Sequence, residues 1–68
     1  MRVTKVGYRL YLITFEYSTE WGGSVKAVFE YNPKNKEISL ISTDDADSLG
    51  WATEQVESFI EKNKKVLK

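Results

Sequence analysis

The sequence predicts an α+β fold: a three-stranded antiparallel β-meander, with residues 2–6 available as a fourth strand, packed on one C-terminal helix in two layers. Three observations predict it. The first 42 residues are rich in β-branched and aromatic side chains, turn residues interrupt them, and a helical apolar stripe follows. A chain of 68 residues is the size of one domain, so residues 1–68 are treated as a single unit.

The three strands are expected at about residues 8–17, 24–31 and 36–42. The second shows the clearest alternation, because Val25, Ala27 and Phe29 share one side while Lys26 lies on the other. Gly7 marks an expected bend or bulge between the N-terminal extension and the first strand.

The loop of the first hairpin is expected at about Thr19 to Gly23, where Gly22 and Gly23 can supply positive φ angles. If Tyr17 opposes Val25, the apolar residues of both strands share one face. The pairs predicted by this register are Phe15 with Ala27, Ile13 with Phe29, Tyr11 with Tyr31 and, on the reverse side, Glu16 with Lys26.

The stretch YNPKNKE, residues 31–37, predicts the turn of the second hairpin. Pro33 presets φ for a type I turn, and Asn35 tolerates the left-handed conformation that often follows. Tyr31 is therefore expected to oppose Lys36. The same register sets Phe29 against Ile38 and Ala27 against Leu40.

The helix is expected at about residues 50–66, with Thr43 or Ser48 as its N-cap. Acidic residues early and lysines late suit the helix dipole. One apolar stripe recurs at helical spacing and should cover the sheet: Ala52, Val56, Phe59, Ile60, Asn63 and Leu67.

The sheet face turned away from this helix carries more apolar side chains than a solvated face needs. These are Tyr8, Leu10, Leu12, Val28 and Ile41. Either the N-terminal segment covers them with Val3 and Val6, or the chain pairs with itself, or they bind a partner protein.

The composition argues against an enzyme, because the chain has neither His nor Cys and no nucleophile, base and orienting group stand together. No cofactor or metal is expected. Asp44, Asp45 and Asp47 fall short of a calcium loop and are interpreted as a polar helix entry, or as an acidic surface toward a basic partner.

Ten basic and ten acidic residues cancel, so the net charge favours neither nucleic acid nor an anionic membrane, although a local patch is still compatible with it. No apolar run has the length of a signal-peptide core or a membrane span, so a protein without targeting segments is expected. The lack of Cys fits a cytoplasmic location.

The two tryptophans are interpreted differently. Trp21 either folds over the end of the sheet beside Tyr17 and Val25 or stays exposed as a partner anchor. Trp51 is expected to plug the open end of the core. The partner-binding residues predicted from the sequence are Tyr8, Leu10, Leu12, Trp21, Val28, Ile41, Asp44, Asp45 and Asp47.

Residues 21–60, with a Trp-Gly pair, a Pro-bearing hairpin and an acidic helix entry, resemble the layout of integrase arm-binding domains. The resemblance implies a sheet that reads the DNA major groove with Arg and Trp side chains. The basic sheet of that family is missing here, since Lys26 stands beside Glu16 and Glu30. The preferred prediction is a small non-enzymatic protein-interaction module, an inhibitor or accessory protein; the alternatives are sheet-face nucleic-acid binding and a designed scaffold without selected function.

Overall fold

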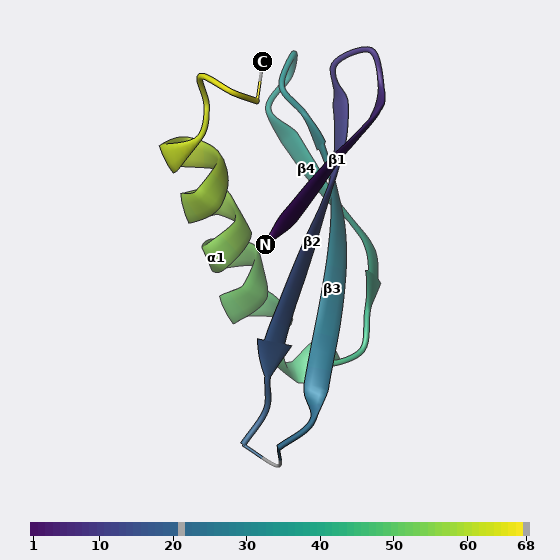
Figure 1. Cartoon of the computed structure of the whole chain (residues 1–68), viewed down its shortest axis with the longest axis vertical. Coiled ribbons are helices and arrows are strands. Elements are labelled where there is room, and N and C mark those ends of the chain that lie inside the picture. The colour runs from purple at the N-terminus through teal and green to yellow at the C-terminus, as the bar shows by residue number, and fades with distance from the viewer. Residues whose placement is uncertain (21, 68) are drawn as a thin grey trace.

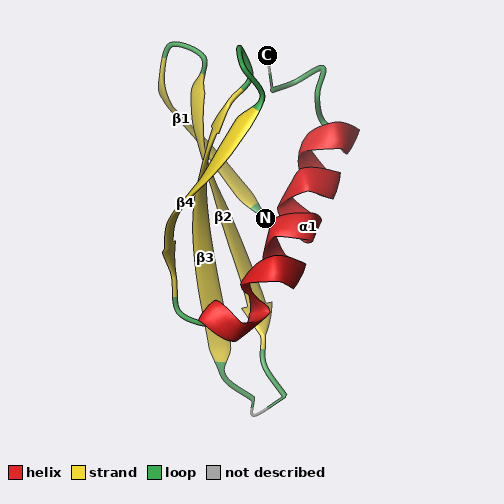
Figure 2. Ribbon diagram, turned by 180° about the vertical axis from the view of Figure 1, so that it is seen from behind, coloured by secondary structure: helices red, strands yellow, loops and turns green. Residues whose placement is uncertain are grey.

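The computed structural model of the chain describes residues 1–20 and 22–67. One antiparallel sheet has the order β1-β2-β3-β4, and a single α-helix lies across one of its faces (Figures 1 and 2). The predicted α+β meander is therefore correct, with the N-terminal segment as its fourth strand. The elements are β1 Arg2–Gly7, β2 Leu10–Ser18, β3 Ser24–Asn32, β4 Glu37–Thr43, the 3-10 turn η1 Ala46–Ser48 and α1 Leu49–Lys62.

The hairpin of β2 and β3 has the predicted register, with Tyr17 opposite Val25 and Tyr11 opposite Tyr31. Its odd-numbered residues face the helix: Ile13 is 0% exposed and Phe29 is 2% exposed. A slip of one residue would turn these side chains to the other face, so apolar burial fixes this register.

The register predicted for β3 and β4 was wrong by two residues. Tyr31 opposes Ile38, because four residues, 33–36, form the turn between the paired Asn32 and Glu37. The left-handed residue in this turn is Lys36, with φ 60°, and not Asn35. A shift of two positions keeps every side chain on its expected face, since strand side chains alternate with period two.

Further along β4 the register shifts again. Leu40 opposes Phe29, but Ser42 opposes the preceding residue Val28, so Ile41 is the extra residue of a bulge. As a result Thr43, and not Leu40, pairs with Ala27. Leu40 was expected in the core but is 42% exposed, because β4 is an edge strand of the sheet.

The N-terminal segment pairs with β2 and does not fold back over the reverse face of the sheet. Val3 opposes Ile13 and packs against the core, whereas Val6 is 48% exposed. A register shift between Lys5 and Gly7 confirms the predicted irregularity there. Both edge strands therefore carry an irregularity of register, a feature that discourages pairing with further strands.

The helix ends at Lys62, four residues earlier than predicted. Asn63 terminates it: the side-chain amide donates to the Phe59 carbonyl oxygen at 2.8 Å. Ser48 holds the N-cap position, but its side chain accepts no capping hydrogen bond from α1, and no acidic residue lies in the first turn. With 14 residues α1 is too short to cross a bilayer, and the described residues hold no other helix that could.

The core lies between α1 and the helix-facing side of the sheet. The predicted stripe supplies Ala52, Val56 and Ile60, which are buried, while Leu67 folds back from the segment after α1 at 4% exposure. The sheet contributes Tyr11, Ile13, Val25, Ala27, Phe29 and Tyr31.

The molecule is elongated, with principal extents of 37 × 20 × 17 Å. The meander places different turns at its two ends. The β1–β2 turn, the β3–β4 turn and the C-terminal segment lie together at one end (Figure 1). The β2–β3 loop and η1 lie at the other (Figure 1). We call these the turn end and the loop end.

Candidate functional site

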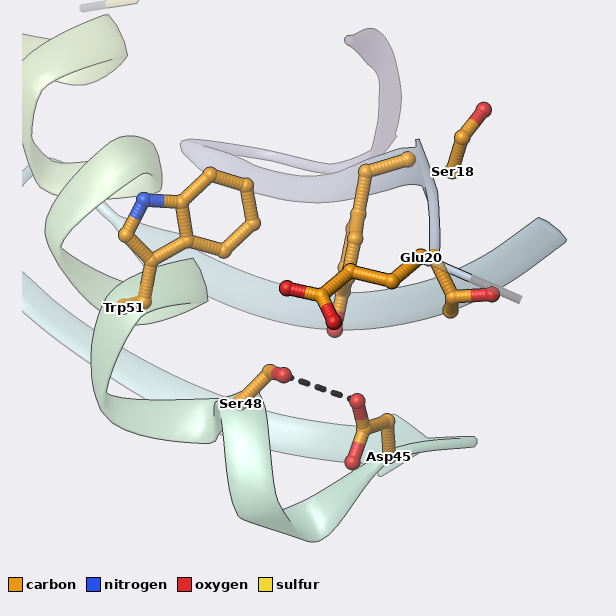
Figure 3. A pocket seen from close by; sticks show the side chains of 7 residues that line it. Ser18, Glu20, Asp45, Ser48 and Trp51 are labelled. Carbon is orange, nitrogen blue, oxygen red and sulfur yellow. Dashed lines mark hydrogen bonds between the residues drawn. The ribbon is translucent and has the colours of Figure 1, made fainter. Parts of the chain in front are cut away.

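The loop end carries a pocket of about 310 Å³. Its walls come from the end of β2 and the following loop, from the segment before η1 and from the start of α1 (Figure 3). The lining residues are Tyr17, Ser18, Thr19, Glu20, Asp45, Ser48 and Trp51. The fold thus brings two sequence-predicted surfaces together, the loop around residue 21 and the acidic stretch that begins at Asp44.

Three aromatic rings form the apolar part of this end. The ring centroid of Trp51 lies 5.4 Å from that of Phe15 and 5.1 Å from that of Tyr17. Trp51 was predicted to plug the open end of the core, but 48% of its surface stays exposed, so it packs on these rings without closing the core. The hydroxyl oxygen of Tyr17 is buried and has no hydrogen-bond partner among the described residues.

Glu20 supplies the uncommitted carboxylate of the pocket. Figure 3 shows its carboxylate directed toward the side of the pocket where the Trp51 indole lies. Glu20 is exposed, and its carboxylate forms no hydrogen bond or ion pair with any described residue. A negative charge and an open indole therefore border the same space, which suits a cation.

Asp45 lines the pocket but is engaged in local structure. One carboxylate oxygen accepts from the backbone N–H of Asp47 at 3.1 Å, and the other accepts from the Ser48 hydroxyl at 2.7 Å (Figure 3). These bonds cap η1, whose first N–H groups have no partner within the turn. These hydrogen bonds hold the Asp45 carboxylate in place, and its charge adds to the negative potential of the pocket.

The other two aspartates of the predicted site do not enter the pocket lining. Asp44 forms two hydrogen bonds with the backbone of Lys26 in β3: its N–H donates to the Lys26 carbonyl at 3.1 Å, and its carboxylate accepts from the Lys26 N–H at 3.3 Å. Asp47 is exposed. Within residues 1–20 and 22–67, no group of three or more His, Cys, Asp or Glu side chains could hold a metal ion.

Trp21 lies outside the described residues, so both interpretations of it stay predictions. The loop around it is held by Thr19, whose N–H donates to the Gly23 carbonyl at 2.9 Å and whose hydroxyl accepts from the Gly23 N–H at 3.1 Å. Of the two glycines only Gly22 adopts a positive φ, 81°.

The predicted apolar sheet face is smaller than the sequence suggested. Leu10, Leu12 and Val28 are half-buried on the side of the sheet away from α1, and the pairing of Leu12 with Glu30 and of Thr14 with Val28 makes Leu12 and Val28 diagonal neighbours. Ile41 lies in the β4 bulge at 53% exposure. Tyr8 was expected in the first strand on this face, but it lies in the β1–β2 turn at 84% exposure.

The turn end carries a second pocket, of about 430 Å³, that the sequence analysis missed. Its lining residues are Lys5, Tyr8, Arg9, Tyr31, Pro33, Lys34, Lys36, Lys64 and Leu67. The predicted first strand, residues 8–17, included Arg9, so the basic turn at residues 8–9 and its closeness to the basic turn at residues 33–36 were not predicted. Arg2 and Lys26 lie away from this pocket, because their strand partners, Thr14 and Glu16, lie further along β2 from the turn end.

Comparison of the chain with protein-family models, with curated proteins and with solved structures found no match.

Proposed function

We propose that the protein is a small non-enzymatic protein-interaction module that receives a Lys or Arg side chain of a partner protein in the loop-end pocket. The observation that carries the proposal is the placement of the free Glu20 carboxylate and the half-exposed Trp51 indole on one cavity. The role fits an inhibitor or accessory protein. The absence of Cys fits a cytoplasmic location, where disulfides are rare.

The chemistry of the pocket favours a cationic side chain with an apolar stem. Its charged head pairs with Glu20 and lies against the indole, and its methylenes contact the ring of Tyr17. A cation over an exposed ring contributes about 0.5–1 kcal/mol, so the pocket alone gives weak binding. A stable complex needs further contact area around it.

The sheet face opposite α1 is the second candidate surface, and its favoured occupant is a second copy of this chain. Leu12 and Val28 are neighbours on the two central strands, and α1 lies on the other side (Figure 2). The same face carries charged side chains of both signs, so opposite charges of two copies can pair; these are Arg2, Lys26, Glu16, Glu30 and Glu37. Solution mass at two concentrations tests this directly: a concentration-dependent dimer that the Leu12→Glu variant loses supports it, and a monomer at both concentrations contradicts it.

The pocket is tested with a short oligoarginine peptide and the fluorescence of Trp51 in a Trp21→Phe background. We expect saturable binding that weakens in Glu20→Gln and hardly changes in Glu57→Gln, an exposed carboxylate on α1 that does not line the pocket. Both variants lose one negative charge, so long-range attraction falls equally in the two. Equal affinities for the two variants would show that only net charge matters and would refute the pocket as the site.

A further inference from the structure

The turn-end pocket concentrates positive charge in a chain with no net charge. It takes Lys5 from β1, Arg9 from the first turn, Lys34 and Lys36 from the third turn and Lys64 from the segment after α1. No carboxylate of the described residues lines it. The sequence places these five cations far apart, and the antiparallel topology brings them to one cavity.

These charges are poorly neutralised. Lys64 pairs with Glu61 at 3.2 Å, but both side chains are well exposed, so the pair screens little. The side chains of Lys5, Lys34 and Lys36 form no ion pair with any described residue. Glu37 follows Lys36 in sequence, but its pairing with Asn32 places it on the opposite face of the sheet from Tyr31. The pocket therefore carries a net positive charge and favours an anionic ligand.

Backbone strain is also located at this pocket. Arg9, with φ 56°, and Lys36, with φ 60°, are the non-glycine residues with positive φ in the described chain, and both line the cavity. This left-handed conformation favours Gly or Asn, so a long cationic residue is a costly choice for a turn. Strained residues that share one cavity are typical of a binding site, where the side chain serves a purpose beyond the turn.

The aromatic side chains that line the pocket favour some classes of anionic ligand over others. Tyr8 is 84% exposed at the tip of the first turn, and the guanidinium carbon of Arg9 lies 5.1 Å from its ring centre. Tyr31 and Pro33 add further apolar lining. A strand with phosphates and flat bases uses both the cations and the exposed ring, whereas an acidic peptide uses the cations alone.

We infer that the turn-end pocket binds single-stranded nucleic acid, with Arg9 and Lys36 on the phosphates and Tyr8 stacking on a base. This site is distinct from the loop-end pocket and from the sheet face, so it does not depend on the proposed protein interaction. It also differs from major-groove reading by a sheet face, because its residues lie in turns at the end of the sheet.

The test is fluorescence anisotropy of a labelled oligothymidylate with the full chain at low and moderate salt. The double variant Arg9→Asn/Lys36→Asn removes two cations and suits the left-handed backbone. We expect it to bind at least about tenfold more weakly, with the slope of log affinity against log salt reduced by about 1.4, while its melting temperature equals or exceeds that of the wild type. The matched control Lys26→Gln/Lys62→Gln removes two exposed lysines outside the pocket and should stay within about twofold of wild type.

A further variant, Tyr8→Leu, keeps every charge and should weaken binding about fivefold or more through lost stacking. The inference is overturned if wild type does not bind at low salt, if the control double weakens binding as much as the pocket double, or if Tyr8→Leu binds like wild type. It is also overturned if an oligoglutamate peptide competes as well as unlabelled oligothymidylate, because the ligand would then be an acidic protein segment. Glu20→Gln should bind the oligonucleotide like wild type, which separates this site from the loop-end pocket.

Discussion

Tyr17 and Trp51 meet edge to face, with ring centroids 5.1 Å apart and ring planes 75° apart. The contact joins the end of β2 to the first turn of α1 and so packs the helix against the sheet at the loop end. The outer part of the same indole borders the pocket, because nearly half of it is exposed. One aromatic pair therefore serves both packing and the proposed binding surface.

The half-exposed state of Trp51 predicts its fluorescence. In a Trp21→Phe variant, emission should lie between that of a buried and that of a solvated indole, and acrylamide should quench it partly. Unfolding should shift the emission to longer wavelength. Emission at the short wavelength of a buried indole, without quenching, would mean that the loop covers the ring and that the pocket is closed.

A matched pair of substitutions tests the assignment of the two sheet faces. Ile13→Val removes a methylene from a side chain that is 0% exposed and should lower the free energy of unfolding by about 0.5–1.5 kcal/mol. Ile41→Val makes the same change in the β4 bulge, at 53% exposure, and should have little effect. Thermal unfolding resolves the difference, since 1 kcal/mol moves the midpoint by about 4–8 °C in a domain of this size. Equal losses would contradict the face assignment.

Two glycines with open space around them should respond oppositely to alanine. Gly22 has φ 81°, so Gly22→Ala should cost about 1–2 kcal/mol of unfolding free energy through backbone strain alone. Gly50 lies in the first turn of α1, and Gly50→Ala should stabilise by about 0.4–1 kcal/mol because the unfolded chain loses freedom. Urea unfolding of both variants measures the two signs, and a stable Gly22→Ala would show that the loop does not need the left-handed residue.

The capping role of Asp45 predicts a stability loss that its neighbour should not share. Asp45→Ala removes the acceptor for the Asp47 N–H and the Ser48 hydroxyl and should cost about 0.5–2 kcal/mol. Asp47→Ala removes an exposed carboxylate and should stay within about 0.5 kcal/mol of wild type. A neutral Asp45→Ala would refute the cap.

Much of the fold can be predicted from the sequence, because the burial of apolar side chains determines the strand register and the helix face. The alternation through Ile13 and Phe29 allows one register for β2 and β3, and the spacing of Ala52, Val56 and Ile60 allows one helix face. The features that the sequence analysis missed depend on backbone conformation. The left-handed Lys36 lengthens the second turn and the bulge at Ile41 shifts the register of the end of β4, and neither leaves a pattern in the hydrophobic residues.

The candidate sites were harder to predict for a related reason. Net charge and composition average over the chain, so the charges of the turn-end cations were offset in the sum by acids such as Asp44 and Glu54, which do not line this pocket. Tyr8 was assigned to a strand face because it alternates with Leu10, whereas the turn at residues 8 and 9 moves it to the end of the sheet. Knowledge of which turns share an end was needed to see the basic pocket.

The most direct test of the two-ended organisation is the amide chemical-shift map of the isotopically labelled chain, titrated separately with oligoarginine and with oligothymidylate. We predict that oligoarginine shifts the signals of Glu20, Ser48 and Trp51, and that oligothymidylate shifts those of Arg9, Lys34 and Lys36. Perturbation of the same residues by both ligands, or of residues spread over the whole surface, would contradict the assignment of opposite binding chemistries to the opposite ends.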